Sequence, residues 1–342
     1  MKEELKQSRY SRQVLFAPIG EEGQRRLGES RVLIVGMGAL GTVLANHMVR
    51  AGVGHVRFID RDFVEPSNLQ RQMLFDEQDA QESLPKAVAA ERKLKHINSE
   101  IHIEGIVGDL TAANIDEVAG QVDLILDGTD NFQTRFLIND YAFKHGIPYV
   151  YGGVVAARGM QATFIPGQTP CLRCLINEGE GTGETCDTSG VLAPVVDIIA
   201  SYQATEALKI LVGKKEALRT TLLSFDLWHG FSHEIKLNQP KTACQTCQKK
   251  EYPALEIKGE RQMTSLCGRD TVQITPATKR EWDLTEWKKR LERVGTVQLT
   301  PFLLRAEVDG LRLVLFTDGR VLVQGTEDVN RAKAVYARYI GM

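Results

Sequence analysis

The sequence lacks long apolar runs, a leader-like start and any marked charge imbalance. No apolar stretch approaches the roughly 18 residues that a helix needs to cross a bilayer. The charged start at residues 1–13 also lacks the apolar core of a signal peptide. The 42 basic and 44 acidic side chains give a net charge of −2, without the basic excess of nucleic-acid-binding proteins. We therefore expect a cytoplasmic protein that binds neither membranes nor nucleic acids.

Cysteine is also scarce, with six residues in 342. In a reducing compartment these thiols indicate metal or thiol chemistry rather than a disulfide frame. Cys171 and Cys174 form one C-x-x-C pair, and Cys244 and Cys247 form another. Two such thiolate pairs complete a closed tetrahedral Zn²⁺ site. Four unrelated surface thiols are the alternative, but two unused pairs would be unusual, so we predict a structural zinc.

The first two-thirds of the chain alternates strand-like and helix-like segments. The predicted strands are 31–36, 55–60, 101–107, 122–127 and 148–152, and the predicted helices are 39–50, 86–97, 132–144 and 194–212. Nearly continuous apolar strands that alternate with helices indicate a sheet buried on both faces. The expected fold is therefore α/β, with a Rossmann-like, largely parallel sheet and helices on both faces.

The pattern changes after Tyr252. Residues 283–286 resemble a capping box that opens a helix, and Asp318-Gly319 lies between two apolar runs, which is a strong hairpin signal. At 342 residues the chain exceeds the usual size of one domain. We predict a nucleotide-binding domain with the zinc site over residues 1–250, a linker over 251–270 and a small α+β domain over 271–342.

A glycine-rich turn follows the first strand. Gly36, Gly38 and Gly41 connect a predicted strand to a predicted helix, where bare N–H groups and a helix N-terminus can meet a phosphate. Asp60 ends the next strand, 19 residues after Gly41, where a carboxylate can accept both ribose hydroxyls. A glycine turn without a ligand is the alternative. We predict an adenine nucleotide site, with mononucleotide and dinucleotide both possible at this point.

Polar residues beyond Asp60 favour nucleotidyl transfer over hydride transfer. Nicotinamide chemistry has no obvious use for Asn68, Arg71 and Lys86 together, whereas departing pyrophosphate needs cationic groups and usually Mg²⁺. A solvated surface pair is the alternative for Arg71 and Lys86. Asp130 follows another apolar strand and suits a metal ion, with a helix N-cap as its alternative.

These residues together resemble the bacterial E1-like adenylyltransferases of the MoeB/ThiF/HesA group, relatives of the ubiquitin-activating enzymes. The matching stretches are RYSRQ (9–13), GMGALG (36–41), D-x-D-x-V-x-x-S-N-L-x-R-Q (60–72), Pro85-Lys86, GTDN (128–131), both cysteine pairs and Thr185-Cys186. The likeness covers roughly residues 5–250, and although a lone glycine motif is weak, the set is specific.

The resemblance implies a role for each matching residue. Asp60 would bind the ribose, Asn68, Arg71 and Lys86 the polyphosphate, and Asp130 would be the Mg²⁺-associated acid. Arg12 would reach the ATP site of the other subunit in a homodimer. The expected catalytic residues are Arg12, Arg71, Lys86, Asp130 and Cys186; the expected nucleotide contacts are Gly36, Gly38, Gly41, Asp60, Asn68, Arg71, Gln72, Lys86, Asp130 and Asn131.

Two further cysteines lie outside the pairs. Cys186 follows the glycine- and glutamate-rich run 178–183, which predicts a mobile loop. The resemblance supports sulfur transfer or thioester exchange by its thiol, and an incidental packing cysteine is the alternative. Cys267 lies beyond the matching region and is interpreted as structural.

The implied activity is ATP-dependent adenylation of the C-terminal glycine carboxylate of a small ubiquitin-fold sulfur carrier. That carrier would serve thiamine thiazole or molybdopterin synthesis, and a cysteine desulfurase or a rhodanese is a possible sulfur donor. No general base is needed, because the carboxylate is already ionised at neutral pH. The rivals are an NAD-dependent oxidoreductase and a zinc-bearing module that only docks partners. The C-terminal domain is expected to bind the carrier or donor, or to widen a dimer interface.

Overall fold

The computed structural model describes residues 9–176, 189–237, 239–256, 270–276 and 281–341, together with the backbone of 263–266. The chain divides into two compact units. The first comprises residues 1–186 with 190–257, and the second comprises 187–189 with 258–342. Within the described residues, no helix is both long and apolar enough to cross a membrane.

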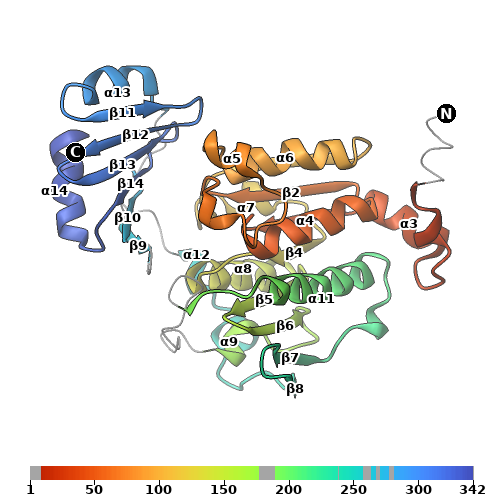
Figure 1. The fold of residues 1–342 in the computed structure, drawn as a ribbon. Coiled ribbons are helices and arrows are strands. Elements are labelled where there is room, and N and C mark those ends of the chain that lie inside the picture. The colour runs from red at the N-terminus through yellow and green to blue at the C-terminus, as the bar shows by residue number, and fades with distance from the viewer. Residues whose placement is uncertain are drawn as a thin grey trace. The chain divides into compact units, whose positions relative to one another are not determined.

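The first unit is built on an eight-stranded sheet with the order β3-β2-β1-β4-β5-β6-β7-β8 (Figure 1). Its strands are β1 (Arg31–Val35), β2 (His55–Asp60), β3 (His102–Val107), β4 (Leu124–Asp127), β5 (Tyr149–Val155), β6 (Arg158–Phe164), β7 (Thr221–Asp226) and β8 (Phe231–Lys236). Strands β3, β2, β1, β4 and β5 pair in parallel. The remaining pairs, from β5 to β8, are antiparallel.

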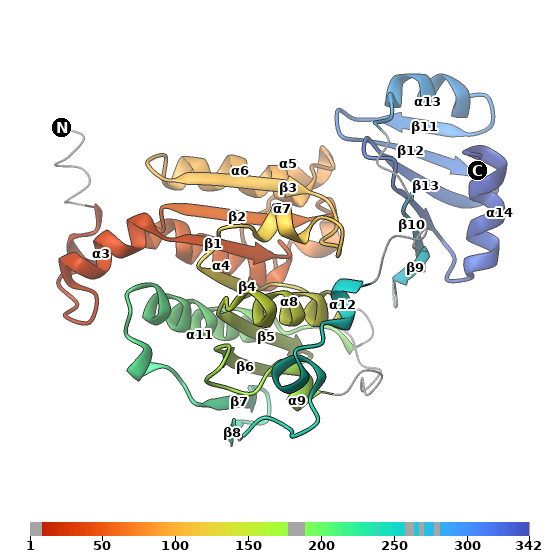
Figure 2. The same ribbon diagram turned by 180° about the vertical axis from the view of Figure 1, so that it is seen from behind.

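Helices cover both faces of this sheet, which confirms the predicted α/β class. On one face, α11 (Ala193–Leu211) packs on β5 and β6 and contacts α4 (Ala39–Ala51), which in turn contacts α6 (Lys86–Ile97). On the other face, α7 (Ile115–Ala119) and α8 (Phe132–His145) enclose a core that includes Leu33, Ile59 and Ile125 (Figures 1 and 2).

Shorter elements complete the first unit. They are α2 (Ser11–Val14), α3 (Gly20–Glu29), η1 (Pro66–Asn68), α5 (Glu77–Gln81), α9 (Leu172–Leu175), η2 (Lys215–Ala217), η3 (Gln245–Lys249) and α12 (Pro253–Glu256).

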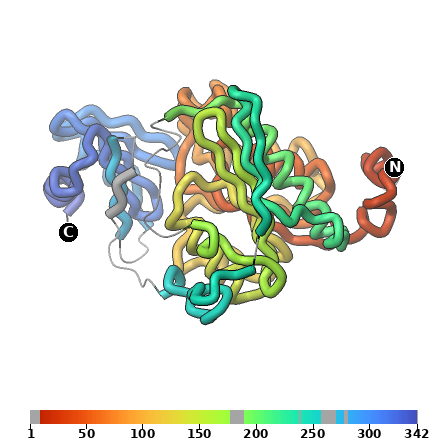
Figure 3. Tube along the Cα trace, turned by 90° about the horizontal axis from the view of Figure 1, so that it is seen from below, coloured from red at the N-terminus to blue at the C-terminus, as the bar shows by residue number. Residues whose placement is uncertain are grey.

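The predicted strands and helices match β1 to β5, α4, α6, α8 and α11 to within a few residues. The antiparallel strands β6, β7 and β8 were not predicted. This part of the chain runs from yellow-green to teal in Figure 3. All six residues of β8 are exposed, so this edge strand carries no buried face from which an apolar pattern could arise.

The second unit holds a six-stranded antiparallel sheet with the order β11-β12-β13-β14-β10-β9. Its strands are β9 (Met263–Leu266), β10 (Thr271–Ile274), β11 (Thr296–Leu299), β12 (Leu303–Val308), β13 (Leu311–Phe316) and β14 (Val321–Gln324), and its helices are α13 (Leu284–Leu291) and α14 (Val329–Tyr339). Both helices pack into a core with Leu304, Leu313 and Val323. This α+β arrangement confirms the predicted fold class.

Two local predictions in the second unit can be compared directly. The hairpin is confirmed, since β13 and β14 pair across residues 317–320 and Gly319 has a φ of +85°. The capping box was only partly right. Asp283 caps α13, but its side chain accepts from the N–H of Thr285, one residue before the position that a capping box uses.

Candidate functional site

The glycine loop between β1 and α4 packs backbone to backbone against the turn that follows β4. A Cβ atom on Gly41 would lie 1.9 Å from the carbonyl oxygen of Gly36, and one on Gly128 would lie 2.6 Å from the same oxygen. At Gly38, by contrast, the nearest atom would be the Gln72 side-chain nitrogen at 3.9 Å. The loop is therefore closed on its inner side and open at Gly38, where α4 begins and an anion can approach its N–H groups.

Asp60 lies directly beside this loop. Its carboxylate accepts hydrogen bonds from the backbone N–H groups of Met37 (2.6 Å) and Asp62 (2.7 Å). Burial raises the pKa of Asp60, while the nearby Lys86 ammonium opposes that rise. Asp60, the residue predicted to bind the ribose, thus lies next to the glycine loop and also stabilises that loop through its hydrogen bond from Met37.

Lys86 is buried at the same edge. It is 3% exposed and opens α6, and its Nζ lies 3.3 Å from Oδ2 of Asp62. A backbone bridge between Phe63 and Pro85 joins the two segments. The surface alternative for Lys86 is therefore wrong. Asp62 was missed as a partner, although its D-x-D spacing after a strand was visible in the sequence.

Asn68, Arg71 and Gln72 follow on the same connection. Asn68 is buried, and its side-chain oxygen accepts the N–H of Glu65. Arg71 is half-buried, and its Nη1 donates to the carbonyl oxygen of Ser67 (3.0 Å). Gln72 is 3% exposed, and its side-chain oxygen has no hydrogen-bond partner. A buried amide with an unsatisfied atom beside the open Gly38 fits a polar ligand at this place.

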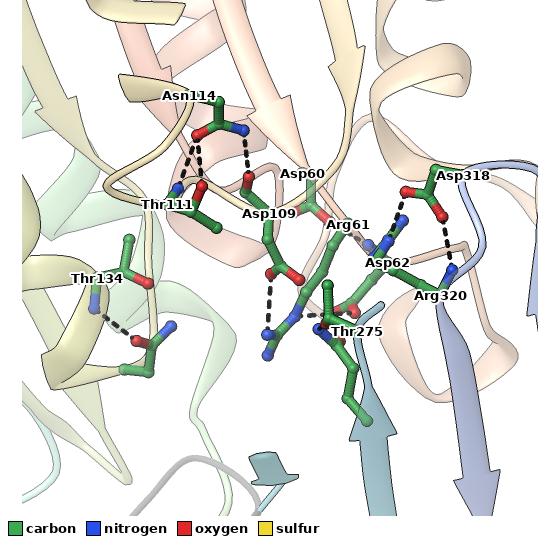
Figure 4. Close-up of polar contacts among 12 residues, drawn as sticks. Asp60, Arg61, Asp62, Asp109, Thr111, Asn114, Thr134, Thr275, Asp318 and Arg320 are labelled. Carbon is green, nitrogen blue, oxygen red and sulfur yellow. Dashed lines mark hydrogen bonds and ion pairs between the residues drawn. The ribbon is translucent and has the colours of Figure 1, made fainter. Parts of the chain in front are cut away.

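Asp130 and Asn131 follow β4 at the same edge of the sheet. Asp130 is exposed, whereas Asn131 caps α8 by accepting the N–H of Thr134 (2.8 Å). The N-cap alternative for Asp130 is therefore wrong. Neighbouring charges that were not predicted include Arg61, whose Nη1 lies 3.0 Å from Asp109 (Figure 4). Burial opposes the charge on Arg61, but Asp109, Asp62 and Asp130 together raise its pKa.

A fully buried carboxylate, Asp127, lies just before the same turn. It pairs with Arg135 (3.2 Å) and accepts the Tyr149 hydroxyl (2.8 Å). Burial disfavours the charged form of Arg135, but Asp127 together with Tyr151, Tyr149 and Asp130 more than offsets it, and the pKa of Arg135 is raised. Sequence reasoning missed this network. The signal that could have revealed this network was Arg135, a charged residue on the buried side of the predicted helix 132–144.

The structure does not bring Arg12 to this site within one chain. Arg12 is exposed on α2, next to Gln13, whose side chain donates to the carbonyl oxygen of Ala51. Ala51 ends α4, while Gly38 precedes its first residue. Thirteen residues of α-helix span about 20 Å, so the segment that carries Arg12 is anchored at the opposite end of α4 from the glycine loop.

The four paired cysteines form one cluster. The Sγ–Sγ distances are 4.0 Å for Cys171–Cys174, 3.5 Å for Cys171–Cys244 and 3.4 Å for Cys174–Cys247. A tetrahedral Zn²⁺ with 2.3 Å bonds holds its sulfurs about 3.8 Å apart. The hydrogen bond from Cys171 lowers the pKa of Cys174, which favours its thiolate form. The donor set and its spacing therefore fit a closed zinc site.

The buried carboxylate of Asp140, on α8, connects both cysteine loops to the body of the unit. It accepts two hydrogen bonds from Arg173 (both 2.9 Å), one from the Thr246 hydroxyl (2.8 Å) and one from the Ala254 N–H (3.0 Å). Arg173 lies between the first pair of cysteines and Thr246 between the second. Asp140 was not singled out from the sequence.

A second group of possible metal ligands has a simpler explanation. His55, His102 and Glu104 lie close together at the start of β2 and β3. Glu104 already accepts from Arg57 (2.7 Å) and lies 3.3 Å from the His55 ring. An ion pair across neighbouring strands accounts for this arrangement. Cys186 and Cys267 lie outside the described residues.

Comparison with known proteins places these features in context. A family model described as the ThiF family matches residues 10–246. The sulfur carrier protein ThiS adenylyltransferase of Bacillus subtilis (strain 168) is 46% identical over 335 residues, which is 97% of this chain and 99% of that protein. The sulfur carrier protein adenylyltransferase of Thermus thermophilus is 38% identical over 253 residues, which is 72% of this chain and 92% of that protein.

The fold also resembles a solved structure. The crystal structure of E. coli MccB with ATP matches with a TM-score of 0.61 at 23% identity, covering 70% of this chain and 74% of that one. At this level of identity the likeness supports the α/β fold alone.

Proposed function

Because the chain belongs to the ThiF family, we propose that it adenylates the C-terminal carboxylate of a small ubiquitin-fold sulfur-carrier protein. The observation that carries the proposal is the convergence of three features at one sheet edge. These are the open glycine loop, the buried ammonium of Lys86 and the exposed carboxylate of Asp130. A nucleotidyl transfer needs all three, whereas hydride transfer or partner docking needs only the first or none.

ATP would lie along the loop with its ribose on Asp60. Gly36, Gly38 and Gly41 would admit the phosphates to the N-terminus of α4. The side chains that would contact the polyphosphate are Asn68, Arg71, Gln72 and Lys86, with Asn131 at the following turn. The unsatisfied oxygen of Gln72 would then gain a partner, for example a ribose hydroxyl or an ordered water.

The reaction joins the carrier carboxylate to the α-phosphorus of ATP. An oxygen of the carboxylate attacks phosphorus, the bond to the β-phosphate oxygen breaks, and pyrophosphate leaves with its electron pair. Lys86 and Arg71 would stabilise the charge on the phosphates, while Asp130 would hold Mg²⁺ beside the α-phosphate. Bound Mg²⁺ supplies charge neutralisation at the phosphate oxygens. No residue is required to remove a proton from the nucleophile.

We further propose a homodimer in which Arg12 completes the partner's site. The anchoring of α2 at the far end of α4 supports this assignment, since Arg12 is held away from its own chain's loop. Mixing Arg12→Ala protein with Asp130→Ala protein tests it. Each single variant should be inactive. After random exchange in an equal mixture, about half of the dimers are mixed and each has one complete site of its two, so about one quarter of all sites should recover. No recovery after subunit exchange would refute action in trans.

Zinc held by the four cysteines would be structural in this scheme, because four thiolates leave no open coordination position. We propose residues 1–250 as the catalytic domain, 251–270 as the linker and 271–342 as an accessory domain. Thioester exchange or sulfur transfer at Cys186, and a cysteine desulfurase or rhodanese as sulfur donor, remain part of the proposal.

A ThiS-like carrier of the thiazole pathway is favoured over a molybdopterin carrier. The Bacillus subtilis relative, a ThiS adenylyltransferase by name, is 46% identical and matches 97% of this chain, which includes the second unit. The probable molybdopterin-synthase adenylyltransferase of Porphyra purpurea is 34% identical and matches 73%. The test is ATP–pyrophosphate exchange with each type of Gly-Gly carrier. We expect exchange with the ThiS-like carrier and its loss in Asp130→Ala. Exchange with neither carrier would sink the proposal, and tight NAD binding without ATP binding would favour the oxidoreductase.

A further inference from the structure

We propose that Arg135 is a positioning residue for adenylation, which holds the turn carrying Asp130 without touching substrate. The inference rests on the proposed function, because the placement of Asp130 matters only if nucleotidyl transfer takes place at this edge. Arg135 lies on α8, and its side chain is 7% exposed. It is therefore buried behind the turn, while Asp130 faces solvent.

The guanidinium of Arg135 joins three separate segments. Its Nε donates to Asp127 at the end of β4 (3.2 Å), and its Nη2 donates to the carbonyl oxygens of Thr129 (2.8 Å) and Gly152 (3.1 Å). The turn is thereby tied to its own strand and to β5. A planar fork of donors can satisfy these acceptors together, whereas a single ammonium group cannot reproduce that geometry.

Asp127 completes the clamp from the other side. One oxygen accepts both the N–H and the hydroxyl of Thr129 (2.9 Å each), and the other accepts the Tyr149 hydroxyl (2.8 Å). The residue after Asp130 is fixed as well, since Asn131 caps α8. The backbone on both sides of Asp130 is thus restrained.

The clamp also reaches the nucleotide loop. Gly128 donates its N–H to the carbonyl oxygen of Val35 at the end of β1 (2.8 Å). A Cβ atom on Gly128 would lie 2.6 Å from the Gly36 carbonyl oxygen and 3.0 Å from the Cα of Gly41, so the two backbones are in close contact. A shift of the turn would therefore move Asp130 and the glycine loop together. Misplacement of reacting groups by about 1 Å can cost roughly 10²-fold in rate.

A purely structural role is the competing explanation, and the energetics bear on it. Burying an ion pair carries a desolvation cost that often cancels its Coulomb gain, so such a pair is weak evidence for stability. The Arg135–Asp127 pair is enclosed by the rings of Phe132 and Tyr151, each 5.1 Å from the guanidinium. The hydrogen bonds of this pair converge on the turn that carries Asp130, so its main effect is expected on the position of that turn.

The test compares Arg135→Lys with Ile138→Ala, a truncation at a fully buried site on the same helix. Both variants should lower the melting temperature. In ATP–pyrophosphate exchange with saturating carrier, Arg135→Lys should lose about 10²-fold in kcat and need more Mg²⁺, with a smaller change in the carrier KM. Ile138→Ala should keep its kcat and its Mg²⁺ dependence.

If Arg135→Lys fails to fold, Thr129→Val and Thr129→Ser decide instead. The valine should lower kcat and the serine should restore it, because only serine retains the hydroxyl that Asp127 accepts. The inference is overturned if Arg135→Lys keeps the kcat of the unaltered protein. If Arg135→Lys does not fold, the same result with Thr129→Val overturns it. It is also overturned if Ile138→Ala loses kcat equally. Absence of exchange by the unaltered protein would instead refute the proposed function.

Discussion

Replacing Asp140 by asparagine tests how the cysteine cluster is held in place. Asp140 is fully buried and accepts hydrogen bonds from Arg173, Thr246 and Ala254. Asparagine keeps the shape but removes the charge, and its NH₂ group cannot accept from these donors. The ion pair between Asp140 and the guanidinium of Arg173 (2.9 Å), whose side chain is 8% exposed, would then be lost.

The size of the effect follows from these contacts. Breaking a buried ion pair by removing one partner costs about 3–5 kcal/mol, which is a large share of the roughly 5–15 kcal/mol that stabilises a typical domain. Both loops that carry the cysteines would loosen, and loss of such supporting contacts lowers metal affinity by about 10–100-fold. We therefore expect the Asp140→Asn variant to release zinc to a chelator faster than the unaltered protein and to unfold at a lower urea concentration.

Glu206→Gln is the matched control. Glu206 is also a buried carboxylate, and it accepts from the Arg219 N–H (2.8 Å) and pairs with Lys209 (2.6 Å). Among the described residues, it bonds none in either cysteine loop. This variant should lower stability and leave zinc release unchanged. Unchanged zinc release in Asp140→Asn, or equally fast release in Glu206→Gln, would contradict the reasoning.

Two further predictions concern the glycine loop and one concerns alkaline pH. Gly41→Ala should destabilise the protein by about 1–3 kcal/mol or more, since its Cβ would meet the Gly36 carbonyl at 1.9 Å; wild-type stability in urea unfolding would refute this. Gly38→Ala has room for its Cβ, so it should fold normally yet bind ATP more weakly by calorimetry; unchanged affinity would exclude phosphates at this position. Burial, and then the Asp127 carboxylate, raise the pKa of Tyr149 well above 10. The protonated phenol stabilises the fold fully below the unfolded pKa of about 10, and this contribution is lost as pH rises toward the folded pKa. Tyr149→Phe should therefore lower the free energy of unfolding at pH 8 by about 1–3 kcal/mol and make its decrease above pH 10 less steep. If urea unfolding gives the same dependence of this free energy on pH for both proteins, the prediction is wrong.

The sequence alone determined those features that short-range patterns encode. Strands β1 to β5 and helices α4, α6, α8 and α11 were predictable because continuous apolar runs and helical periodicity depend on neighbours a few residues apart. The glycine turn and the two C-x-x-C pairs were predictable for the same reason, since bare backbone and metal-ligand spacing are local requirements. The family resemblance then gave these residues their expected roles.

Only the tertiary structure decided which distant residues meet. The two cysteine pairs are brought together across some 70 residues of chain by Asp140 on a third segment. Lys86 is buried against Asp62, and Arg135 joins Asp127 to the turn of Asp130. The sequence shows these residues, but local spacing does not show which of them pair. The edge strand β8 was missed because all of its residues are exposed, so it has no buried face from which an apolar pattern could arise. Burial and charge pairing are set by packing between segments far apart in sequence, and that packing places Asp130 at the edge where the phosphates of ATP are proposed to bind.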